Sequence, residues 1–105
     1  MTHEDYINQL RIKQVETANG ILASQIEILE GIRRLVAIQR ELGAPNDDDS
    51  LFLIGVESES DHLPIGNSRK YWNGAALKER DSEIRAFEST VRDQVLDICR
   101  RISVS

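Results

Sequence analysis

The first forty residues carry a hydrophobic stripe that is too wide for one helix to bury alone. Residues 3–42 contain no proline and are rich in residues that favour a helix. Thr2 is the expected N-cap, and Gly43 followed by Pro45 marks the expected end. Between residues 21 and 36 the apolar positions cover a sector of roughly 140°. They are Ile21, Leu22, Ile26, Ile28, Leu29, Ile32, Leu35 and Val36. We call this set the stripe.

The pattern predicts one long helix over about 3–42. Asn19-Gly20 is its weakest point, because both residues are poor helix formers and Asn-Gly is a turn signal. A helix over 3–18, a bend and a second helix over 21–42 is the alternative. Because the apolar columns continue through position 20 without a change of phase, we expect a single helix that can be kinked there.

Two further segments complete the chain. Residues 74–102 are again periodic and proline-free, and Asn73 is a good N-cap, so we expect a second long helix there. Residues 43–73 hold both prolines and predict an irregular connector. Within it, the apolar run Leu51–Val56 predicts a short helix over 49–56, although a buried strand gives the same pattern. Residues 57–73 would return as an extended or looped strap.

Opposite charges recur four residues apart in the second long helix. The pairs are Asp81–Arg85, Glu88–Arg92 and Asp97–Arg101. Side chains at this spacing are neighbours on a helix surface, so we expect three ion pairs within the helix.

These elements predict an all-α fold, with residues 1–105 forming one domain built on an antiparallel helical hairpin. A hairpin covers only part of the stripe, so we expect two copies to form a homodimeric four-helix bundle. The expected dimer interface consists of Ile21, Leu22, Ile28, Leu29, Ile32, Leu35 and Val36. In the alternative, residues 51–56 cover part of the stripe within one chain.

Composition narrows the possible functions. The chain has 13 Lys and Arg against 18 Asp and Glu, a net charge of −5, which argues against nucleic-acid binding. One cysteine excludes an internal disulfide framework. No apolar run is long enough to span a membrane, and residues 1–5 lack a signal-peptide pattern, so a cytoplasmic protein is expected. There is no catalytic-triad or phosphate-loop pattern, so we expect neither an enzyme nor a cofactor.

Two parts of the connector are candidate sites. Glu57, Glu59, Asp61 and His62 could ligate a metal, but their spacing matches no known metal motif, and a solvated loop explains them better. Arg69, Lys70, Tyr71 and Trp72 combine cations with aromatic rings, a composition that is typical of partner-binding surfaces. The competing interpretation is a strap that packs on the helices, and contact with an anion or nucleic acid is the least favoured.

The sequence therefore predicts a non-enzymatic interaction protein, an adaptor or a regulator, which binds a partner through residues 57–73 or the flank of the bundle. The alternative hypothesis is a protein that binds a metal or a small ligand at residues 57–62.

Overall fold

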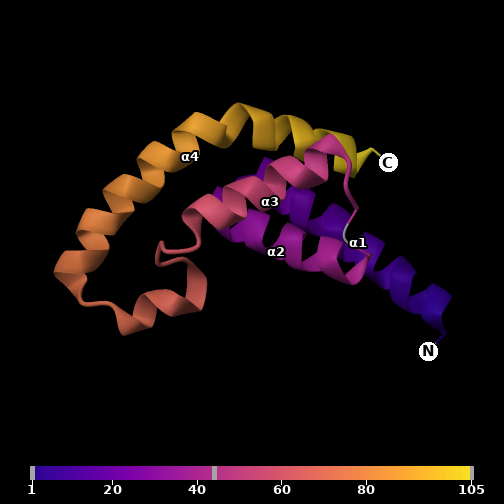
Figure 1. Ribbon diagram of the computed structural model, residues 1–105, viewed down its shortest axis with the longest axis horizontal. Coiled ribbons are helices and arrows are strands. Elements are labelled where there is room, and N and C mark those ends of the chain that lie inside the picture. Colours follow the sequence, from indigo (N-terminus) through magenta and orange to yellow (C-terminus); the bar gives the residue numbers. More distant parts are fainter. Residues whose placement is uncertain (1, 44, 105) are drawn as a thin grey trace.

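The computed structural model describes residues 2–43 and 45–104, and these residues form helices and turns without a strand (Figure 1). The elements are α1 (His3–Leu22), α2 (Ile28–Glu41), α3 (Asp48–Ser60), the 3-10 helix η1 (Gly66–Tyr71) and α4 (Gly74–Ser103). The all-α prediction is confirmed. The expected helix over 74–102 agrees with α4, and the expected short helix over 49–56 lies within the longer α3.

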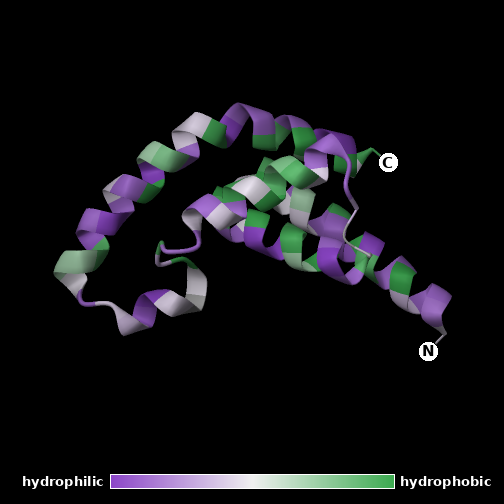
Figure 2. Cartoon of the chain, viewed as in Figure 1, coloured by the Kyte–Doolittle hydropathy of each residue, from purple (hydrophilic) through white to green (hydrophobic). Residues whose placement is uncertain are grey.

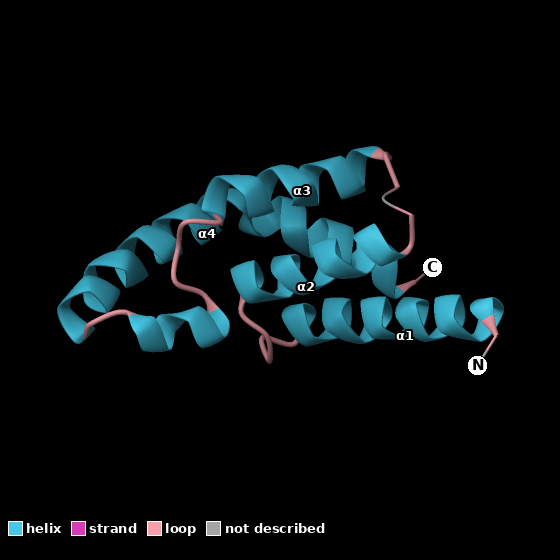
Figure 3. Cartoon of the chain, turned by 60° about the horizontal axis from the view of Figure 1, so that its bottom comes forward, coloured by secondary structure: helices cyan, strands magenta, loops and turns pink. Residues whose placement is uncertain are grey.

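The expected single helix over 3–42 is wrong, because the chain reverses between α1 and α2 (Figure 3). The Gly20 carbonyl accepts hydrogen bonds from the N–H groups of Gln25 (2.8 Å) and Ile26 (3.1 Å). Ser24 has φ +58°, a left-handed conformation that is uncommon outside glycine. The turn is therefore formed at a serine, a residue type that does not predict this conformation.

Two glycines let α1 and α2 pack closely after this turn. A Cβ atom on Gly20 would lie 2.5 Å from the Cδ1 atom of Ile26, and one on Gly31 would lie 2.4 Å from that of Ile21. Both separations are far shorter than a van der Waals contact. Gly20 of the Asn19-Gly20 pair therefore contributes to the hairpin by allowing close packing. The backbone itself reverses at residues 23–27.

The hydrophobic core lies among all four α-helices of the described chain. α3 contributes Leu53 and Val56, and α4 contributes Val95, Ile98 and Cys99. Figure 2 shows hydrophobic residues concentrated in α3 and along α2, where these helices pack together. A bundle of four helices, which we expected from two chains, is formed here by one.

This core removes the basis of the expected dimer interface. Within one chain, Ile21, Ile28, Leu29, Ile32, Leu35 and Val36 are buried, and Leu22 is half-buried. The premise that a single chain cannot cover the stripe is wrong, because the reversal at residues 23–27 folds α2 back and α3 then covers it. Homodimer formation stays a prediction, and the width of the stripe no longer supports it.

The first half of α4 arches away from the other helices before the C-terminal part joins them (Figure 1). Asn73 begins α4 by accepting a hydrogen bond from the N–H of Ala76 (2.8 Å), as the sequence predicted. None of the helices in the described residues is long and apolar enough to cross a membrane.

Candidate functional site

The strap is confined to residues 61–73 because α3 continues to Ser60, and a buried apolar segment follows its first two, exposed residues. Leu63, Pro64 and Ile65 are buried against the helices. Arg33 of α2 donates hydrogen bonds to the carbonyls of Ser60 (2.7 Å) and Leu63 (3.1 Å). Carbonyls at the end of a helix lack partners within the helix, so Arg33 both caps α3 and fixes the start of the strap.

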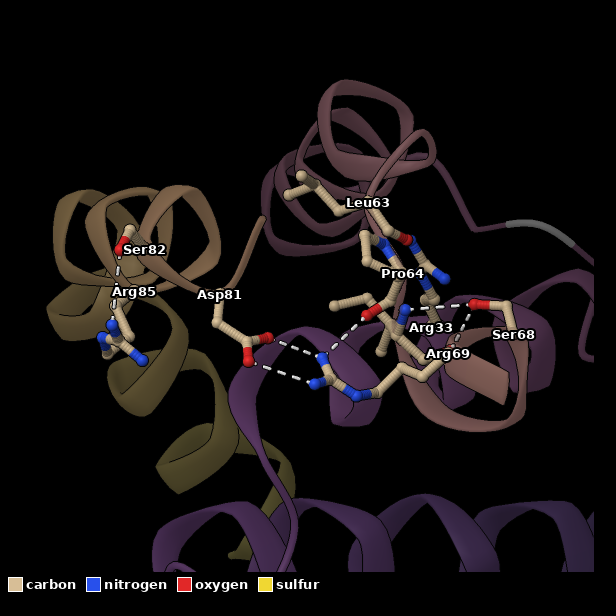
Figure 4. A network of polar contacts seen from close by, with 9 residues as sticks. Arg33, Leu63, Pro64, Ser68, Arg69, Asp81, Ser82 and Arg85 are labelled. Carbon is tan, nitrogen blue, oxygen red and sulfur yellow. Dashed lines mark hydrogen bonds and ion pairs between the residues drawn. The ribbon is translucent and has the colours of Figure 1, made fainter. Parts of the chain in front are cut away.

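Arg69 fastens the strap to α4. Its guanidinium donates to both carboxylate oxygens of Asp81, at 2.7 and 3.1 Å, and to the carbonyl of Pro64 at 3.3 Å (Figure 4). These hydrogen bonds hold the pKa of Asp81 below its ordinary value of 3.8 and raise that of Arg69. Arg69 was predicted to bind a partner, but the structure engages it within the chain.

The next three residues stand at the outer surface of the strap. The Tyr71 side chain is 81% exposed, and the Lys70 ammonium lies 5.2 Å from the centre of its ring, within cation–π range. Trp72 is 36% exposed. We call Lys70, Tyr71 and Trp72 the aromatic tip. The strap thus uses its early residues for packing and presents these three to solvent.

The four candidate metal ligands are not brought together. Glu57 accepts a hydrogen bond from Arg40 (2.9 Å), and His62 pairs with Glu83 (3.2 Å). Because α3 continues to Ser60, Glu57 and Glu59 are separated by about 160° around the helix axis and lie on opposite sides of it. Asp61 is exposed at the end of α3. Within residues 2–43 and 45–104, no three His, Cys, Asp or Glu side chains gather as a metal site would require.

A cleft of about 630 Å³ lies between the α1–α2 turn, the strap and α4. Its apolar lining consists of Ile21, Leu22, Ile26, Ile28, Pro64, Ile65, Gly66, Ile84 and Leu96. Its polar lining consists of Ser24, Glu27, Glu30, Arg69, Asp81, Arg85, Glu88 and Arg92. Three chain segments that are distant in sequence therefore share one concave surface.

Glu88 of α4 closes one side of the cleft by capping α2. Its carboxylate accepts a hydrogen bond from the N–H of Leu29 (3.2 Å). Glu27, the residue at the N-cap of α2, makes no side-chain capping bond. An anion is stabilised at the N-terminus of a helix, so Glu88 supplies a cap from a different helix.

The expected ion pairs within α4 are not formed, because their carboxylates have other partners. Asp81 binds Arg69, and Asp97 pairs with Arg100 (2.7 Å). Arg101 binds Asp49 at the start of α3 (2.8 Å). Asp81, Glu88 and Arg101 bind groups on other elements, whereas Asp97 pairs three residues along α4 instead of four.

Sequence reasoning missed the cleft and the cap that Glu88 provides. Both depend on the chain reversal at residues 23–27, which was not expected. The one available signal was the cluster of charges along residues 81–92, which predicted charged neighbours but not their partners. Comparison of the chain with protein-family models, curated proteins and solved structures finds no match.

Proposed function

We propose that the chain is a non-enzymatic interaction protein, an adaptor or a regulator, that binds a protein partner through the aromatic tip. The observation that carries this proposal is the exposure of Tyr71, 81% in solvent with Lys70 beside its ring. Tyr and Trp side chains dominate binding energy at protein interfaces, because they bury a large area at little cost in conformational entropy.

The tip is held in place on both sides. Ser68 accepts a hydrogen bond from the N–H of Ile65 (3.1 Å) and donates to its carbonyl (2.8 Å). Arg69 is bound to Asp81, and Asn73 caps α4. A segment that is ordered before binding loses less entropy on association. The partner that fits has an apolar pocket for the Tyr71 ring and a carboxylate for Lys70.

Site-specific photo-crosslinking tests the proposal. A photoreactive phenylalanine analogue replaces Tyr71 in cells that produce the protein, and cross-linked proteins are identified by mass spectrometry. The matched control places the same analogue at Tyr6, which is 41% exposed near the far end of α1. We expect a defined partner from position 71 that position 6 does not capture. A second copy of this chain counts as a partner and would place self-association at the tip.

The purified partner is then titrated against variants. We expect Tyr71→Ala and Trp72→Ala each to weaken binding about tenfold or more, as loss of a hot spot does. Leu51→Ala removes an apolar side chain that is 52% exposed on α3 and should leave binding unchanged. Equal capture at positions 6 and 71, or unchanged affinity of the Tyr71 variant, would refute the proposal.

A further inference from the structure

Two arginines on α4 lack the ion pairs that their spacing predicts, because other elements take the carboxylates one turn before them. Arg85 still lies near enough to Asp81 to contribute to the lowered pKa of that carboxyl. In the sequence, Asp81 precedes Arg85 and Glu88 precedes Arg92 by one helical turn. In the structure, Asp81 binds Arg69 on the strap, and Glu88 caps α2. No ion pair among the described residues includes Arg85 or Arg92.

Both arginines line the cleft. They are seven residues apart, which places them on one face of α4 with a rise of about 10 Å between them. The guanidinium of Arg85 is turned toward Ser82, its contact at 3.5 Å, and away from Asp81 (Figure 4). Long arginine side chains from these two positions can converge on one anionic group, and their planar donors match a carboxylate.

Two of the four carboxylates that share the cleft are held in ion pairs. Arg69 pairs with Asp81, Arg34 pairs with Glu30 (3.1 Å), and Glu88 faces the N-terminus of α2. Glu27 and Glu88 are the lining carboxylates outside an ion pair. Three arginines and four carboxylates line the cleft, and Arg85 and Arg92 are the two arginines of this lining that no ion pair among the described residues holds, so an anionic group would bind at these two side chains.

Aliphatic side chains lie next to this charged surface. Leu22, Ile26 and Leu96 line the cleft and are half-buried, so part of each is accessible. The volume of about 630 Å³ falls within the range of roughly 300–1,000 Å³ of small-molecule sites. The cleft therefore places Arg85 and Arg92 next to a small apolar surface.

We propose that the cleft binds a small amphipathic carboxylate, with its head group on Arg85 and Arg92 and a short aliphatic tail on Leu22, Ile26 and Leu96. This site is separate from the aromatic tip. It does not depend on the proposed interaction function.

Calorimetric titration with octanoate tests the site on the full chain, with octanol and octylammonium as probes that keep the tail and change the head. We expect octanoate to bind. Octanol should bind about tenfold more weakly, because it lacks the charge-assisted hydrogen bonds. Octylammonium should show no binding. Shift changes in an NMR titration should fall on the residues that line the cleft.

Charge-matched variants locate the binding. Arg85→Gln and Arg92→Gln should each weaken octanoate binding about tenfold. Arg100→Gln removes the same charge from α4 outside the cleft and should have little effect. Glu27→Gln should strengthen binding, since it removes one of the two lining carboxylates outside an ion pair. All these side chains are exposed, so thermal melting should confirm that the variants stay folded.

Three results would overturn the site: no octanoate binding, equal loss in the Arg92 and Arg100 variants, or equal binding of octylammonium. Tyr71→Ala should leave octanoate affinity unchanged, so failure of this site and failure of the proposed interaction surface are distinguishable.

Discussion

The two halves of α4 are held by different forces. The C-terminal half places Val95, Ile98 and Cys99 in the core, where they are almost inaccessible to solvent. The N-terminal half, residues 74–88, which we call the arm, buries Ile84, packs the half-buried Phe87 against the core and otherwise depends on polar contacts. These are the Arg69–Asp81 pair, the His62–Glu83 pair and the bond from the Leu29 N–H to Glu88.

This difference predicts that one half of a continuous helix can separate while the other half stays in the core. Apolar burial does not depend on a titratable group, whereas exposed ion pairs are weak and respond to both pH and salt. Regions with few buried apolar contacts open at lower cost than the core does. We therefore expect the arm to separate from the strap while the C-terminal half stays packed.

The largest expected effect is in the core. Ile32→Ala should lower the free energy of unfolding by about 2–5 kcal/mol, because it leaves a cavity among fully buried side chains. Ile84→Ala in the arm should cost less, about 1–2 kcal/mol, since that site can collapse or open. Ile12→Ala, at a side chain that is 57% exposed, is the control and should change little. Urea denaturation measures all three, and equal losses at residues 32 and 84 would contradict the distinction.

A smaller effect is expected where α1 meets α2. Gly31→Ala places a Cβ atom against buried Ile21 and should destabilise the fold by about 1–3 kcal/mol, although alanine favours a helix. Gly55→Ala in α3 meets nothing within 4 Å and should stabilise by up to about 1 kcal/mol. Opposite signs in thermal melting confirm the close approach, and the same sign for both would disprove it.

The arm should respond to pH before the core does. Arg69 lowers the pKa of Asp81 below 3.8, and Arg80 followed by His62 lowers that of Glu83 below 4.5. A carboxyl group whose pKa is depressed by folding stabilises the native state above its unfolded pKa and loses this contribution as pH falls through the folded value. The arm contacts are therefore intact at neutral pH and weaken below about pH 4.

Hydrogen exchange measures this release. Asp81→Asn should speed amide exchange in the arm at neutral pH and leave residues 95–102 unchanged, because it removes the charge that Arg69 binds. Asp97→Asn breaks an exposed pair outside the arm and serves as the control. Unchanged exchange in the arm of the Asp81 variant would show that Ile84 and Glu88 suffice to hold it.

The smallest expected effect is a difference in the reactivity of buried thiols. Burial raises the pKa of the Cys99 thiol to about 11, so the thiolate that reacts with iodoacetamide is scarce at pH 8. We expect alkylation of Cys99 to require global unfolding. A cysteine at Ile84, in a chain with Cys99→Ala, should react faster through opening of the arm. Similar alkylation rates at residues 84 and 99 would show that the two halves of α4 open with equal ease.

The sequence predicted the helices whose signals are local. Asn73 and the apolar column that follows it determine where α4 begins, and the run Leu51–Val56 marks α3. The reversal between α1 and α2 was not predictable in this way. It is formed at Ser24 in a conformation that usually indicates glycine, while the apolar periodicity continues across it.

Composition alone identified part of the candidate site, the cations and aromatic rings of residues 69–72. Lys70, Tyr71 and Trp72 are all exposed in the connector, Tyr71 to 81%, and their role in binding stays a prediction. The inward engagement of Arg69 depends on Asp81, twelve residues away, and the cleft depends on three separate segments. Such contacts follow from the tertiary arrangement, which a pattern within one segment does not contain.

The cap on α2 has a consequence for how the chain is made. Glu88 lies 59 residues after Leu29, so a nascent chain completes α2 long before the residue that caps it leaves the ribosome. In the folded chain Glu27 provides no side-chain cap for α2. The N-terminal hairpin can therefore reach its final form only after residue 88 has been translated.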